Sequence, residues 1–308
     1  MKYYQQRSGQ RLSIGQDGNT LTMLIAVQLI VFVILAFIKV VYYFTYGAEG
    51  LGLYNHDILD WVTLPANPTT FLTRPWTLLT HMFVHDAVWH LIANMLWLWA
   101  FGYILQDLTG NRKLFPLFFY GALAGAAVFI LSYNVIPSLK EMGADSKALG
   151  ASAGVMAIAI GTTVMAPNYR IFPMINGGIP LWVLTLVFVV IDLATIPYNN
   201  PGGHLAHLAG AGMGLLFVQQ LRRGRDWGGW INSFFDWTNN LFNPAKPARN
   251  KSPKTQLYYK SSVAPYKKTV HLTQQKVDEI LEKIHQKGYH SLSEDEKDVL
   301  KRASKEDL

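Results

Sequence analysis

Eight polar side chains interrupt stretches of the sequence that are otherwise apolar, and several could perform acid–base or nucleophilic chemistry. They are His81, His85, His90, Asn94, Ser152, Asp192, His204 and His207. Polar and ionisable groups at membrane depth are costly, so each of them is a candidate for function. A serine hydroxyl is a weak nucleophile until a base takes its proton. Chemistry at Ser152 therefore requires that the fold bring a histidine to it.

The composition places these groups in an apolar protein. Half of the 308 residues are hydrophobic and only 15% are charged, against about 25% in ordinary soluble domains. The mean hydropathy is +0.15. These values argue against a disordered chain and against a purely water-soluble enzyme. The chain has no cysteine, which excludes disulfides, a thiolate nucleophile and a cysteine zinc site.

Six apolar segments are candidate membrane spans, since a spanning helix needs about 20 mostly apolar residues. The segments are Leu21–Tyr43, Trp89–Leu105, Leu114–Val135, Gly150–Ala166, Ile179–Ile196 and His204–Leu221. The sequence thus predicts an all-α membrane protein, a six-helix bundle. The long segment Gly47–Pro75 is expected to form a structured loop at the outer surface, with Trp61, Phe71 and Trp76 at headgroup depth.

Positive charge gives the orientation of the bundle. Lysine and arginine precede span one, separate spans two and three, separate spans four and five, and follow span six. Because positive charge near span ends stays cytoplasmic, both termini are predicted to be cytoplasmic. We expect a multi-pass integral membrane protein, placed in a bacterial inner membrane.

The orientation brings four polar groups to one depth. Spans two, four and six run from outside to inside, and each group lies within roughly the first two turns of its span. At about 1.5 Å of rise per residue, all four lie just below the outer surface. They are His90, Asn94, Ser152 and His207.

Small residues predict that Ser152 and His207 meet. Ser152 opens a helix, where free N–H groups and the positive dipole end suit an oxyanion. Gly210 and Gly214 form a small-residue face one turn below His207, which can pack closely on another helix. The expected partners on span four are Gly154, Ala157 and Gly161. Such packing would bring the Ser152 hydroxyl within reach of the His207 imidazole.

The remaining polar groups complete this interpretation. Asn94 falls one turn after His90, and an amide and an imidazole N–H are suitable oxyanion donors. No carboxylate is obvious as a third member, so the prediction is a Ser–His dyad. Asp192 is interpreted as a structural group that bonds hydroxyl or backbone groups, and His204 as a loop or surface histidine.

Three motifs in this order resemble those of the rhomboid intramembrane serine proteases. They are His-x-x-x-Asn at 90–94, Gly-Ala-Ser at 150–152 and Ala-His-x-x-Gly-x-x-x-Gly at 206–214. The resemblance extends over about Leu21 to Leu221. It implies Ser152 as nucleophile, His207 as general base, and His90, Asn94 and the Ser152 N–H as the oxyanion site. It also implies that span five and the loop before it gate substrate entry.

The sequence departs from the family pattern at two places. Ala153 follows the serine where the family usually has glycine, and Trp76 is followed by Thr77 where the family loop usually has Trp-Arg. The expected activity is that of a serine endopeptidase without a cofactor. The expected partners are single-span membrane proteins as substrates and membrane lipids, and not nucleic acid.

Two other functions are open to the same residues. A membrane metalloenzyme could use histidines at 81, 85, 90, 204 and 207, since i,i+4 histidines share a helix face. Against it, the chain has no glutamate at the His-Glu-x-x-His position. An inactive rhomboid-like protein that binds membrane proteins is the other alternative, but it would not need both Ser152 and His207.

The domain organisation follows from the change in composition after span six. Residues 1–20 are predicted to be a cytoplasmic segment and 21–221 the six-span catalytic domain. Residues 222–265 are predicted to be a juxtamembrane amphipathic segment and linker, rich in Pro, Lys and Ser towards its end. Residues 266–308 are predicted to be a cytoplasmic helical hairpin, in which Ser293 and Glu296 form a capping box.

Overall fold

Helices account for most of the residues that the computed structural model describes, which are 19–143, 145–172, 174, 177–198, 200–241 and 274–304. The chain divides into two units, Met1–Pro244 and Ala245–Leu308. Most of the predicted N-terminal segment and most of the predicted linker lie outside the described residues.

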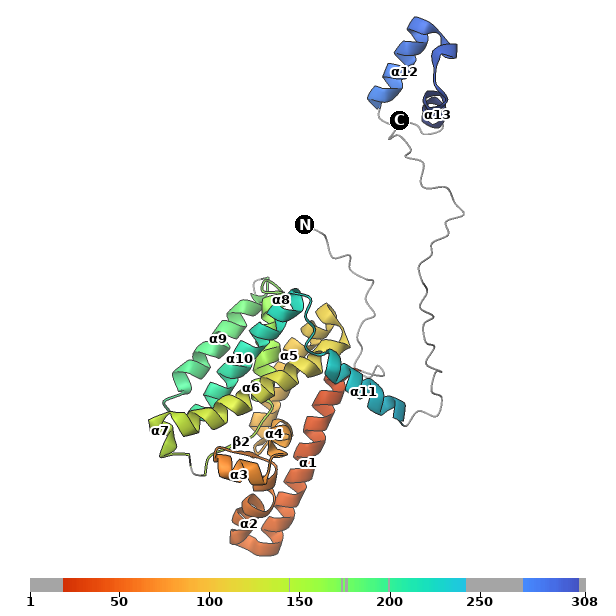
Figure 1. Ribbon diagram of the computed structural model, residues 1–308. Coiled ribbons are helices and arrows are strands. Elements are labelled where there is room, and N and C mark those ends of the chain that lie inside the picture. Colours follow the sequence, from red (N-terminus) through yellow and green to blue (C-terminus); the bar gives the residue numbers. More distant parts are fainter. Residues whose placement is uncertain are drawn as a thin grey trace. The chain divides into compact units, whose positions relative to one another are not determined.

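Each of the six apolar segments forms a helix in the first unit (Figure 1). These helices are α1 (Thr20–Tyr46), α5 (Val88–Thr109), α6 (Leu114–Val135), α8 (Ser152–Met165), α9 (Leu181–Thr195) and α10 (Pro201–Arg222). In the described part of the chain, three helical stretches have the length and composition to cross a membrane: Thr20–Trp61, Val88–Thr109 and Asn111–Val135. Helices α8 and α9 are apolar but shorter. The count of six crossings therefore stays a prediction.

Helix α8 lies at the centre of the bundle, against α5, α6 and α10. Its residues Val155 to Ala159 are each at most 1% exposed. A helix that is apolar on all sides is typical of a buried core element. Ser152 is the first residue of this helix, so a helix buried at the centre of the bundle carries the candidate nucleophile.

Glycines of α10 let its backbone touch that of α8. A Cβ atom added at Gly210 would collide with the Ala153 carbonyl, and one added at Gly214 with the Ala157 carbonyl. The predicted contact of the glycine face with Ala157 is thus confirmed. Gly154 does not face α10, contrary to expectation, but the Phe118 ring of α6. The reason is helical geometry, since residue 154 points about 100° away from 153 and about 60° away from 157.

The long segment between α1 and α5 is structured, as predicted. It contains η1 (Gly47–Glu49), α2 (Gly50–Asp57), η2 (Leu59–Trp61), β1 (Leu64–Pro65), α3 (Pro68–Thr73), α4 (Thr77–Thr80) and η3 (His81–Phe83). Trp61 and Trp76 stack with ring centroids 6.0 Å apart, and the Arg74 guanidinium lies 4.4 Å from the Trp61 ring. Arg74 thus anchors this loop, although it precedes the tryptophan instead of following it.

Short elements complete the first unit. Strand β1 pairs antiparallel with β2 (Lys147–Ala148), with Leu64 opposite Ala148. Strands β3 (Arg170–Ile171) and β4 (Ile179–Pro180) form a second antiparallel pair. The remaining helices are η4 (Asn111–Lys113), α7 (Pro137–Lys140) and α11 (Gly229–Leu241). Helix α11 lies within the predicted juxtamembrane segment, and its Trp230 Nε1 donates to the Tyr120 hydroxyl at 2.6 Å.

The second unit contains helices in the region that the sequence predicts to be a helical hairpin. It consists of α12 (Gln274–Lys287), η5 (Tyr289–Ser291) and α13 (Glu294–Ala303). The capping box is confirmed, because the Ser293 N–H donates to Glu296 and the Glu296 N–H to the Ser293 hydroxyl. Ile280, Leu292 and Val299 are buried together. Leu281, in contrast, is exposed.

The contact between α8 and α10 predicts the effect of added volume. Gly214→Val should lower the free energy of unfolding by about 1–3 kcal/mol, because its side chain meets backbone that cannot move aside. Gly212→Val is the matched control, since a Cβ at Gly212 meets nothing within 4 Å. Thermal unfolding of both variants in detergent measures the difference, and equal midpoints would contradict this packing.

Candidate active site

The turn before α8 holds Ser152 in place. Gly150 has a φ of +115°, a left-handed conformation that favours glycine. The Gly150 N–H donates to the His81 carbonyl at 2.9 Å. A Cβ at Gly150 would lie 2.8 Å from Cε1 of His90. Position 150 therefore requires glycine. Because Gly150 has no side chain, the His90 ring has room beside Ser152.

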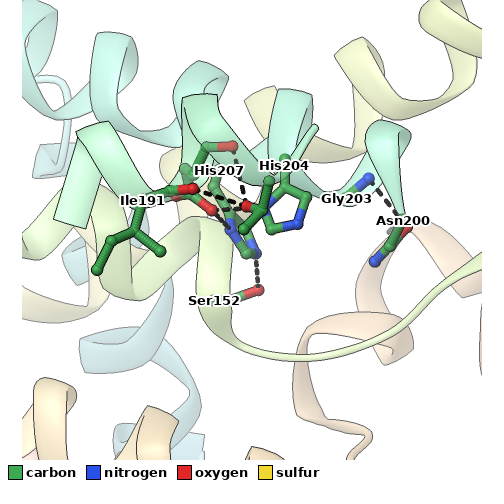
Figure 2. A network of polar contacts seen from close by, with 8 residues as sticks. Ser152, Ile191, Asn200, Gly203, His204 and His207 are labelled. Atoms are coloured by element: carbon green, nitrogen blue, oxygen red, sulfur yellow. Dashed lines mark hydrogen bonds and ion pairs between the residues drawn. The ribbon is translucent and has the colours of Figure 1, made fainter. Parts of the chain in front are cut away.

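His207 reaches Ser152 from α10 (Figure 2). Its Nε2 lies 2.6 Å from the Ser152 Oγ. Asn200 caps the start of α10 by accepting from the Gly203 N–H at 3.1 Å, and Pro201 is the first helical residue. The two side chains that the sequence predicts to meet are thus within hydrogen-bond distance. The hydroxyl can donate its proton to the imidazole, which is the arrangement of an activated serine.

A carboxylate that the sequence analysis treated as structural also lies at this histidine. Asp192 Oδ1 lies 2.9 Å from Nδ1 of His207 and 2.6 Å from Nδ1 of His204. The interpretations of these two residues are therefore wrong. Asp192 pairs with imidazoles rather than with hydroxyl or backbone groups, and the His204 side chain is only 19% exposed. Their i,i+3 spacing on α10 places both histidines on the face towards α9.

The two predicted oxyanion donors differ in position. His90 lines a cavity of about 320 Å³ together with Gly150, Ser152 and His207. Asn94 is buried, and its amide nitrogen donates to the His90 carbonyl at 2.9 Å. It is not one of the residues that line the cavity. The geometry therefore brings His90 to Ser152, whereas Asn94 bonds within its own helix.

His81 and His85 are buried residues of the segment that precedes α5, apart from the Asp192 group. Burial lowers the pKa of His81 to about 4, although its ring nitrogen Nδ1 bonds the Thr77 carbonyl at 3.0 Å. Burial, and next the charge of His90, lowers the pKa of His85 to about 4. Neither ring nitrogen of His85 has a hydrogen-bond partner among the described residues. Both rings are therefore neutral at neutral pH.

The predicted metal alternative can be compared with these distances. Among the described residues, Asp192, His204 and His207 form a group whose ligand atoms lie within 4.8 Å of one another. His81, His85 and His90 do not join it. Two ligands bound about 2.0–2.1 Å from one tetrahedral zinc stand roughly 3.3 Å apart. The contacts of 2.6 and 2.9 Å are shorter and fit direct hydrogen bonds.

Comparison with known proteins gives the family of this fold. A family model described as the rhomboid domain matches residues 72–223. This region of the chain belongs to the rhomboid domain family. A second model, a family of unknown function (DUF6576), matches residues 265–306, the region of the helical hairpin. The rhomboid match therefore covers α5 to α10, including Ser152 and His207, but not α1.

Three curated relatives each match about half of the chain. Rhomboid protein 1, mitochondrial, from Saccharomyces cerevisiae is 30% identical over 48% of this chain and 42% of its own length. RHOMBOID-like protein 12, mitochondrial, from Arabidopsis thaliana is 28% identical over 49% and 48%. Rhomboid-type serine protease 2 from Neurospora crassa is 27% identical over 54% and 60%. The chain spans about half the length of these relatives.

The buried neutral histidines predict how stability depends on pH. An unfolded histidine gains its proton near pH 6.5, whereas folded His81 and His85 bind theirs only near pH 4. Between these two pH values the unfolded state binds more protons than the folded state. The free energy of unfolding therefore falls as pH drops from about 6.5 to 4. Each ring lowers the free energy of unfolding by roughly 3 kcal/mol across this pH range.

Removing one ring tests this dependence. His85→Phe should reduce the loss of thermal stability between pH 7 and pH 4.5, measured in detergent. His56→Phe is the control, since the His56 side chain is 81% exposed, and it should follow the wild type. An equal loss in the wild type and His85→Phe would show that His85 does not titrate as its burial requires.

Proposed function

We propose that this chain is a rhomboid-type intramembrane serine endopeptidase that cuts single-span membrane proteins near the outer leaflet. The observation that carries the proposal is the 2.6 Å contact between Ser152 Oγ and His207 Nε2. It lies at a cavity of about 320 Å³ that both residues line. The Neurospora crassa relative is named as a rhomboid-type serine protease, which supports the same reaction class.

The reaction begins at the serine. Ser152 Oγ attacks the scissile carbonyl carbon while its proton passes to His207 Nε2. Collapse of the tetrahedral intermediate breaks the C–N bond, and the amine leaves with the proton from Nε2. A water molecule then loses a proton to Nε2 and attacks the acyl-serine, which releases the carboxylic acid and restores Ser152.

Two groups can stabilise the oxyanion in this site. The N–H of Ser152 lies at the start of α8, where the first-turn N–H groups have no intrahelical acceptor. The His90 ring lies beside Gly150 at the cavity wall. The Asn94 amide bonds the His90 carbonyl in this structure. It can donate to the oxyanion, as predicted, only if it turns away from that carbonyl.

The substrates and their entry follow from the bundle. Cleavage requires an extended backbone, so segments weakened by glycine, or by small residues that favour turns, should be cut most readily. Entry through a gate formed by α9 and the loop before it suits the exposed apolar side chains of that helix, among them Leu186, Val187 and Val190. Such side chains are compatible with lipid or with a substrate helix.

Orientation and location extend the proposal. We infer six crossings, both termini in the cytoplasm, and a cytoplasmic hairpin at residues 266–308 that is separate from the catalytic domain 21–221. The curated relatives named above include two mitochondrial proteins, so they lend no support to a bacterial inner membrane. A metalloenzyme is disfavoured by the contact distances at Asp192. An inactive binder would not require the Ser152–His207 contact.

Replacement of the nucleophile is the direct test. Ser152→Ala should abolish cleavage of a model single-span substrate in liposomes and leave the folded fraction unchanged. Ser146→Ala is the matched control, because this half-buried serine uses its hydroxyl to bond the Met142 carbonyl. Substantial residual cleavage by Ser152→Ala would exclude the serine mechanism. Loss of cleavage in both variants would point to a structural cause.

A further inference from the structure

Asp192 is a buried carboxylate in an apolar helix, and the dyad mechanism does not use it. The residue is 3% exposed, and its Oδ2 has no hydrogen-bond partner among the described residues. Its neighbours Ile191 and Leu193 are apolar and more than half exposed. A buried carboxylate on an apolar helix is energetically costly, so we expect a contact that offsets the cost of its burial.

The contact lies on the histidine that faces Ser152. An ionised carboxylate only accepts hydrogen bonds, so the hydrogen of His207 must sit on Nδ1, 2.9 Å from Asp192 Oδ1. The other ring nitrogen, Nε2, then carries a lone pair towards the Ser152 hydroxyl, 2.6 Å away. This is the only neutral tautomer in which His207 can take the serine proton.

We propose that Asp192 is a positioning residue that fixes the tautomer and orientation of His207. The site then contains a hydrogen-bonded Ser–His–Asp triad. The proposal rests on the proposed protease function. When His207 takes the Ser152 proton at Nε2, the cation that forms keeps its Nδ1–H on Asp192, and the carboxylate remains ionised. Asp192 therefore acts through His207 and does not touch the substrate.

His204 offers a competing role for the carboxylate. Its Nδ1 lies 2.6 Å from the same Oδ1, and Asp192 is one of three buried residues of α9, with Leu181 and Thr185. Asp192 could therefore serve only to tie α9 to α10. A structural tie predicts a loss of stability, whereas a positioning role predicts a loss of turnover in protein that is still folded.

The first measurement separates these roles by steady-state kinetics on a single-span substrate. Asp192→Leu removes both acceptor oxygens, has similar branching, and suits an apolar helix. It should lower kcat by roughly 10²- to 10⁴-fold with little change in KM, as expected when the base loses its tautomer. The kcat of Asp192→Asn, which keeps one acceptor oxygen, should lie between the kcat of Asp192→Leu and that of the wild type. Asp226→Asn, at an aspartate ion-paired with Lys113, is the matched control and should keep the wild-type rate.

The second measurement reports the tautomer itself and needs no proteolysis. Nitrogen-15 spectra of histidine-labelled protein at neutral pH, with His207 assigned from His207→Gln, should show a protonated Nδ1 and an unprotonated Nε2. In Asp192→Leu the His207 signals should shift towards the Nε2–H form. His204→Gln should leave the His207 signals in place, because the Asp192–His207 contact does not need His204.

The outcomes distinguish this inference from the proposed function. If the wild type cuts no substrate, the protease proposal fails, and the spectra still decide whether Asp192 sets the tautomer. An unchanged His207 signal in Asp192→Leu, or an unchanged kcat in its folded fraction, overturns the positioning role. If His204→Gln alone reproduces the spectral change of Asp192→Leu, the carboxylate acts through His204 and the proposal is also overturned.

Discussion

The close approach of α10 to α8 is the contact on which the rest of the site depends. Gly210 lies against the Ala153 carbonyl and Gly214 against the Ala157 carbonyl. A side chain at either glycine would push the helices apart and move His207 away from Ser152. At a donor–acceptor distance of 2.6 Å, a displacement of 1 Å would already break the hydrogen bond. The two glycines therefore determine the distance between Ser152 and His207, although neither glycine takes part in the reaction.

Around this contact, the fold places polar groups where they meet one another instead of lipid. The loop before α5 is tied to the turn before α8 by the β1–β2 pair and by the bond from Gly150 to His81. Gly150 in the same turn lies against the His90 ring of α5. On the other side, α9 presents Asp192 to the histidines of α10. Three separate elements thus converge on the first turn of one buried helix.

The sequence predicted the parts of this arrangement that depend on local pattern. Apolar length predicted the helices, the glycine spacing predicted the α8–α10 contact, and the depth argument predicted that Ser152 meets His207. It did not predict what depends on the rotation of one helix against another. Asn94 shares a helix face with His90, yet its amide bonds the His90 carbonyl. Asp192 lies fifteen residues before His207 on another helix, so no spacing rule joins them, and its only signal was a charge in an apolar run.

The most direct test of the account maps where a serine-directed phosphonate attaches to the purified, folded protein. Only a serine with a base at hydrogen-bond distance should react at neutral pH. The account predicts a single adduct on the peptide that contains Ser152, and none there in His207→Ala. An unmodified Ser152 in folded wild-type protein, or equal modification of Ser152 without His207, would contradict it.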